Sequence, residues 1–143
     1  MSSPGRRPVE TPREWLRFAQ EDLMVAEWAI RDDLPAYHTI CFLCQSAAEK
    51  SLKGCLVSRG WQLQKTHDVV ALLGLCAEYD PIWAHLVPAA AILNEYIVAG
   101  RYPGDLAAYD VERSDAEEAL HAARCIVAQA RELTGVPLDG SPS

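Results

Sequence analysis

Helical periodicity, with start and stop signals at its ends, is the sequence feature that most restricts the fold. The first helical run opens at Thr11, which can cap a helix, with Pro12 in the first helical position. Glu14 stands where a capping box requires an acidic residue. Apolar residues then recur at helical spacing until the sequence DDLP, where Pro35 ends the run. This pattern predicts a long first helix.

Four further segments show the same period. The short third helix begins at Asp68, with Thr66 as its N-cap. Pro88 bends or splits the fourth helix, and the last helix has a capping box of Ser114 with Glu117 and a C-cap at Gly135. The expected ranges are 36–58, 68–78, 81–97 and 114–134.

No segment competes as a strand, because β-branched residues are few and never alternate over a useful length. The sequence therefore predicts an all-α, up-and-down bundle of four long helices plus one short helix, with a longer connection at 59–67. A chain of 143 residues suits one domain. We expect the helical domain over 11–134, a mobile arm over 1–10 and a mobile tail over 135–143.

Composition and charge exclude several classes of protein. Half of the residues are apolar, so a core can form without disulfides or metal, and the five cysteines are expected to be reduced and mostly buried. The formal charge of −7 argues against a broad nucleic-acid binder, so any such contact must be local or use a partner's charge. There is no run of about eighteen apolar residues for a membrane span, and no secretory signal. A cytoplasmic protein is expected.

The stretch NEYIVAGRYPGD places an arginine and a tyrosine where a helix ends. Pro103 forces Tyr102 out of helical geometry. Arg101 could bind a phosphate through two hydrogen bonds. It could instead bond the last free carbonyls of the helix, or pair with Glu49 inside the bundle. Tyr102 could stack on a base or pack as an ordinary aromatic side chain.

Other charged residues offer a similar choice between structure and binding. Glu49 and Lys53 are spaced for a helical ion pair, and with Lys50 they could form a solvated charged face. Alternatively, Lys50 or Lys53 joins Arg101 in an anion pocket. His67, in the first turn of the third helix, could bond a neighbouring helix or contact a phosphate.

Metal and cofactor sites are not predicted. Cys41 and Cys44, with His38 three residues earlier, have a metal-like spacing, but they lie in one apolar helix and lack a second ligand pair. No Gly-rich phosphate loop and no Ser-His-Asp or Cys-His arrangement occurs at a recognisable spacing.

Three motifs in this order resemble the HEPN family of small helical domains. They are QSAAEKSLK in the second helix, THD at 66–68 and RYP at 101–103. The resemblance covers roughly residues 15–133. It implies a five-helix bundle that forms homodimers, and a frequent association with a minimal nucleotidyltransferase, in several cases as a toxin–antitoxin pair.

Other HEPN members are metal-independent ribonucleases, in which an arginine followed after four to six residues by a histidine carries the chemistry. In this chain those positions after Arg101 are Leu106, Ala107 and Ala108, none of which can transfer a proton. The expected role is therefore a nucleotide- or nucleic-acid-binding and dimerisation module rather than an enzyme.

Two alternatives to that role stay open. One is a ribonuclease with an altered catalytic set, in which Arg101 stabilises the phosphate and Asp105 or His67 moves the proton. The other is a purely structural helical module whose dimer face is its function.

Overall fold

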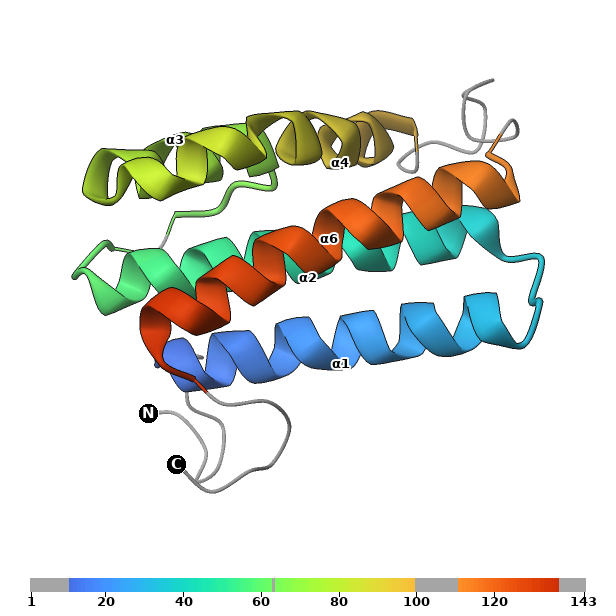
Figure 1. Ribbon diagram of the computed structural model, residues 1–143, viewed down its shortest axis with the longest axis horizontal. Helices are drawn as coiled ribbons and strands as arrows, with labels where there is room; N and C mark the ends of the chain where they lie inside the picture. The colour runs from blue at the N-terminus through green and yellow to red at the C-terminus, as the bar shows by residue number, and fades with distance from the viewer. Residues whose placement is uncertain (1–10, 63, 100–110, 137–143) are drawn as a thin grey trace.

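The structure, a computed structural model, describes residues 11–62, 64–99 and 111–136 and confirms the all-α prediction (Figure 1). No strand occurs in these ranges. The predicted arm, 1–10, and most of the predicted tail, 135–143, lie outside the described residues. The elements are α1 (Pro12–Arg31), α2 (Tyr37–Ser58), α3 (Val69–Tyr79), the 3-10 helix η1 (Pro81–Leu86), α4 (Val87–Ala99) and α6 (Arg113–Thr134).

Helix α2 lies at the centre of the bundle. It packs most extensively against α1 and α6, and it also contacts α3 and α4, which form a second layer across it (Figure 1). A helix covered on several sides must be lined by small residues if its neighbours are to approach closely. The buried residues of α2 accordingly include Cys41, Cys44, Ala47, Ala48, Ser51, Gly54 and Cys55.

The ends of α1 and α6 show which capping predictions hold. Thr11 caps α1, and its hydroxyl accepts a hydrogen bond from the Glu14 backbone N–H at 3.1 Å. Gly135 ends α6 in the left-handed conformation, with φ of 70°. The predicted capping box of Ser114 and Glu117 is wrong. Glu112 is the N-cap and Asp115 its partner, whose carboxylate accepts from the Glu112 N–H at 2.9 Å.

The start of α3 also differs from the prediction. Asp68, not Thr66, is the N-cap, and its carboxylate accepts from the Ala71 N–H at 3.0 Å. An anionic acceptor is favoured at a helix N-terminus because the free N–H groups there carry partial positive charge. The Thr66 hydroxyl accepts instead from the Asp68 N–H at 3.2 Å, which shapes the turn before the helix.

The predicted fourth helix is divided, as the position of Pro88 suggested. Residues Pro81–Leu86 form a 3-10 helix, and α4 begins at Val87. Pro88 then lies in the first turn of α4, where its missing N–H would have no helical partner. The fourth helix is consequently only 13 residues long.

Four of the five cysteines are buried, as expected, and Cys125 is half-buried; all five are free. Burial raises the pKa of the Cys41, Cys44 and Cys55 thiols to about 12, so they are neutral at physiological pH. None of the helices in the described ranges is long and apolar enough to cross a membrane.

At Gly54, α2 lies very close to α1. A Cβ added at this residue would lie 2.5 Å from Leu16 Cδ2 and 3.1 Å from Trp15 Cβ. Leu16 is fully buried, so it has little room to move. The absence of a side chain at Gly54 therefore allows α1 to seat against α2.

We predict that Gly54→Ala lowers the free energy of unfolding by about 1–3 kcal/mol, because the added methyl overpacks this contact. Gly74, in α3, is the matched control, since a Cβ there meets nothing within 4 Å. Gly74→Ala should stabilise the protein by up to about 1 kcal/mol through helix propensity. Urea denaturation measures both. Equal effects of the two substitutions would contradict the close approach.

Candidate functional site

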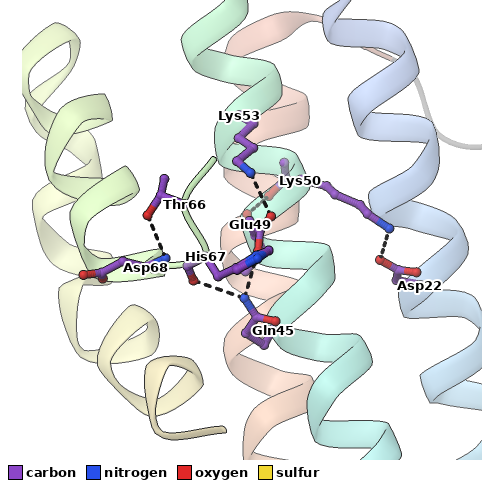
Figure 2. A network of polar contacts seen from close by, with 10 residues as sticks. Asp22, Gln45, Glu49, Lys50, Lys53, Thr66, His67 and Asp68 are labelled. Carbon is purple, nitrogen blue, oxygen red and sulfur yellow. Dashed lines mark hydrogen bonds and ion pairs between the residues drawn. The ribbon is translucent and has the colours of Figure 1, made fainter. Parts of the chain in front are cut away.

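A network of polar side chains on α2 gathers around the carboxylate of Glu49 (Figure 2). Its Oε1 atom accepts hydrogen bonds from Gln45 Nε2 at 3.1 Å and from His67 Nδ1 at 2.8 Å. Its Oε2 atom accepts from Lys53 Nζ at 2.9 Å. Gln45, Glu49 and Lys53 are spaced four residues apart and so share one face of α2. His67 reaches this face from the connection that precedes α3.

Burial distinguishes this network from an ordinary surface ion pair. Lys53 is only 7% exposed and the Glu49 side chain 12% exposed. The interpretation of Glu49 and Lys53 as a solvated charged face is therefore wrong, although the predicted ion pair between them exists. His67, which belongs to the connection before α3, contacts the Glu49 carboxylate on this part of α2. The Lys53 ammonium also lies 5.8 Å from the ring centroid of Trp15 in α1.

His67 is the exposed member of the network. Its side chain is 60% exposed, while its Nδ1 atom faces the Glu49 carboxylate. Because a carboxylate oxygen can only accept, Nδ1 must carry the proton of this hydrogen bond. In a neutral imidazole, Nε2 is then the acceptor. Within the described residues no hydrogen bond uses Nε2.

The backbone next to His67 is held from two sides. The carbonyl oxygen of His67 accepts from Gln45 Nε2 at 3.2 Å. On the other side, Asn94 of α4 accepts from the Val69 N–H and donates to the Asp68 carboxylate, both at 2.8 Å. The hydrogen bond from Asn94, with that from the Ala71 N–H, lowers the pKa of Asp68. The network thus extends from α2 to α4, the helix that leads to Arg101.

Opposing effects set the charge of Glu49. Burial disfavours the carboxylate, but hydrogen bonds from Lys53, His67 and Gln45 and the nearby Lys53 charge outweigh it. The net result is a pKa for Glu49 below its usual value. Glu49 is therefore an anion at neutral pH, and it forms an ion pair with the largely buried Lys53.

Lys50 takes part in a separate contact. Its Nζ atom donates to Asp22 of α1 at 2.9 Å, with the Lys50 side chain 30% exposed (Figure 2). Both lysines predicted for an anion pocket are thus paired with carboxylates. Arg101, Tyr102 and Asp105 lie outside the described residues. Of the six predicted site residues, the structure brings Lys53 and His67 together through Glu49 and leaves Lys50 on the α1 side.

Sequence reasoning assigned no role to Gln45 or Asn94, the residues that complete the network. The spacing of Gln45, Glu49 and Lys53 was visible as an i, i+4, i+8 series on one helical face. Asn94 opens the stretch that contains Arg101, but its contacts are 25 and 26 residues away along the chain. Among the residues described, no group of three or more His, Cys, Asp or Glu could hold a metal ion.

Comparison with known proteins now decides the family. The HEPN domain family model matches residues 12–133, which is most of the chain. The chain belongs to the HEPN family. The comparison with curated proteins found no relative.

Two solved structures are similar to this HEPN domain. TT1696 from Thermus thermophilus is 34% identical, with a TM-score of 0.75. ST0689, an archaeal HEPN homologue, is 24% identical, with a TM-score of 0.70, and supports the fold alone. Each alignment covers 87% of this chain and 98% of the other. The HEPN match spans the whole polar network, from Trp15 to Asn94.

We predict that Glu49→Gln lowers the free energy of unfolding of the HEPN domain at pH 7 by about 1–3 kcal/mol, because it leaves the Lys53 charge without an anion. Asp22→Asn is the matched control. Its partner Lys50 is more exposed, so the loss should stay below about 1 kcal/mol. Urea denaturation of the two variants and the parent protein measures the difference.

The pH dependence of this effect has a defined sign. The folded-state pKa of Glu49 is below the unfolded value, so its contribution is present above the unfolded pKa. That contribution is lost as the pH falls through the folded pKa. The gap in stability between parent and Glu49→Gln should therefore close in acid, below about pH 4.5. A gap that stays constant from pH 7 to pH 3 would contradict this assignment.

Proposed function

We propose that this chain is a nucleotide- or nucleic-acid-binding and dimerisation module that acts with a nucleotidyltransferase partner, as in a toxin–antitoxin pair. Membership of the HEPN family supports the general role. The observation that carries the binding proposal is the exposed His67 ring, which Glu49 orients and which hydrogen bonds connect to α4. The partnership and a cytoplasmic location rest on the family and on the sequence.

The ion pairs of α2 limit which residues could bind a phosphate. Lys50 and Lys53 each donate to a carboxylate, so neither is a free cation. With a formal charge of −7, the chain also repels extended polyanions. We therefore assign phosphate binding to Arg101, with Tyr102 as a stacking surface and His67 as a hydrogen-bonding group. Such a small site suits a single nucleotide or an RNA end.

Nucleotide binding is the first test of this function. We expect ATP, or another nucleoside triphosphate at millimolar concentration, to raise the melting temperature of the purified chain. Arg101→Ala should abolish the shift, because it removes the guanidinium that binds the phosphate. His67→Gln should weaken it, and Lys50→Ala should retain it, since Lys50 already pairs with Asp22. Isothermal titration calorimetry gives the affinities.

Two results would contradict the binding proposal. One is the absence of a shift with any nucleotide; the other is a shift that Arg101→Ala leaves unchanged. The partnership is tested separately, by asking whether the adjacent reading frame encodes a nucleotidyltransferase and whether the two proteins copurify.

Metal-independent RNA cleavage is the second candidate, and the hydrogen bond between Glu49 and His67 specifically favours it. An imidazole whose Nδ1–H is held by a carboxylate presents Nε2 as a base, the arrangement that general-base catalysis uses. His67 Nε2 would take the proton of the ribose 2′-hydroxyl while the 2′-oxygen attacks the phosphate. The bond from phosphorus to the 5′-oxygen then breaks, the 5′-oxygen takes a proton from water, and a 2′,3′-cyclic phosphate is left. Arg101 would stabilise the charge on the phosphate.

Incubation of the purified chain with RNA tests this second candidate. If the chain cleaves RNA, His67→Gln should slow cleavage by about a hundredfold or more, since a positioned base typically contributes that much. Asp105→Asn decides whether the other predicted base acts instead. Cleavage that survives both His67→Gln and Arg101→Ala would indicate a contaminating nuclease. Absence of cleavage, with or without the partner, removes the enzyme and leaves the binding or structural role.

A further inference from the structure

The solvent-facing side of α1 carries an unusual concentration of large apolar side chains. Met24 and Val25 are each 47% exposed, and Trp28, one turn further along, is 59% exposed. Single exposed apolar residues are common on proteins, but contiguous ones mark interaction surfaces. Tryptophan is also among the residues enriched in the anchors of protein interfaces.

A groove runs beside this apolar surface, between α1 and α6. Both helices pack on α2, and between them they leave a space of about 380 Å³. Its lining is half apolar, with Leu23 and Met24 from α1 and Val127 and Ala128 from α6, and half polar, with Gln20, Glu27, Arg124 and Arg131. Arg124 closes one side through an ion pair with Glu27 at 3.3 Å. Met24 belongs both to the groove and to the apolar surface, so the two form one continuous feature.

The charges on the same face of α1 are arranged symmetrically. Glu21 lies five residues before Ala26 and Arg31 lies five residues after it, and both are exposed. Met24 and Trp28 are likewise two residues before and after Ala26. If two copies of α1 lay antiparallel with their centres at Ala26, each Glu21 would face an Arg31. Each Trp28 would face a Met24 at the edge of the groove.

We propose that α1 is the dimer face of this protein. It packs antiparallel against α1 of a second copy, about a two-fold axis at the level of Ala26. Each Trp28 enters the α1–α6 groove of the other copy, next to Met24. This inference rests on the dimerisation included in the proposed function and adds the surface that performs it.

A second copy fits this face better than an unrelated partner because the face is complementary to itself. An isologous interface requires that each contact occur twice, with the roles of the two copies exchanged. The charges of α1 meet this requirement, because Glu21 of each copy would face Arg31 of the other. The shape of α1 meets it as well, because Trp28 of each copy would face Met24 of the other. A helix of 20 residues gives a contact about 30 Å long. The groove adds the burial that one helix pair alone would lack.

Sedimentation velocity of the full chain over a range of concentrations tests the proposal. The parent protein should form dimers, and Trp28→Glu should weaken dimerisation by about tenfold or more, because it removes a central aromatic anchor. Phe42→Glu is the matched control. Phe42 is an aromatic residue of α2 with similar exposure, 52%. It should leave the dimer intact. Circular dichroism establishes that both variants are folded.

Charge reversal distinguishes this antiparallel arrangement from any other use of α1. Glu21→Arg and Arg31→Glu should each weaken the dimer severalfold, because like charges then face each other across the interface. The double variant should recover the parent affinity. Recovery is expected only if the two residues meet between copies.

Three outcomes would overturn the proposal. A chain that is monomeric at all concentrations has no such dimer. A dimer that Trp28→Glu and both charge reversals leave unchanged uses another face, although dimerisation itself would stand. If Trp28→Glu abolishes binding of a nucleotidyltransferase to a monomeric chain, the face belongs to that partner.

The dimer proposal and the nucleotide-binding proposal can fail separately. Nucleotide binding by a monomeric Trp28→Glu variant would show that the binding site does not depend on this surface.

Discussion

The central position of α2 constrains the rest of the structure. Four helices contact α2. Its residues must therefore be small where neighbouring helices approach, and its buried polar side chains must have hydrogen-bond partners. Gly54 meets the first requirement, by letting α1 seat against it. The Glu49 carboxylate meets the second by accepting from three donors. A lysine as buried as Lys53 would be costly to keep charged without that carboxylate.

The same hydrogen bonds that satisfy α2 also build the candidate site. One oxygen of Glu49 accepts the hydrogen bond from Lys53, a buried charge that needs such a partner. The other oxygen of Glu49 accepts from His67 and so orients its ring. Gln45 holds the backbone carbonyl of His67, and Asn94 ties the next two residues to α4. His67 is therefore held from two helices while most of its ring stays exposed. Exposure alone would give a mobile side chain, whereas these contacts hold the His67 ring in one orientation.

Local sequence signals predicted the helices well because the cause of each lies within a few residues. Thr11 and Gly135 act as predicted, and Pro88 divides the fourth helix. The errors arose where neighbouring residues compete or where distant segments meet. Asp68 and Glu112 took the capping positions expected for Thr66 and Ser114. Glu49 and Lys53 meet side chains that are distant in the sequence, His67 and Trp15, and helical periodicity cannot show such contacts.

The proposed dimer face and the contacts to the candidate site lie on the same helix, α1. Trp15 of α1 lies under the Lys53 ammonium, and Asp22 of α1 binds Lys50, the residue next to Glu49. Trp28, Met24 and Val25 belong to the same rigid helix as these two residues. A shift of α1 against α2 would move Trp15 and Asp22 relative to the Glu49 network, and Gly54 leaves little room for such a shift. The close contact at Gly54 therefore keeps α1, and with it the proposed dimer face, in a fixed position relative to the residues that orient His67.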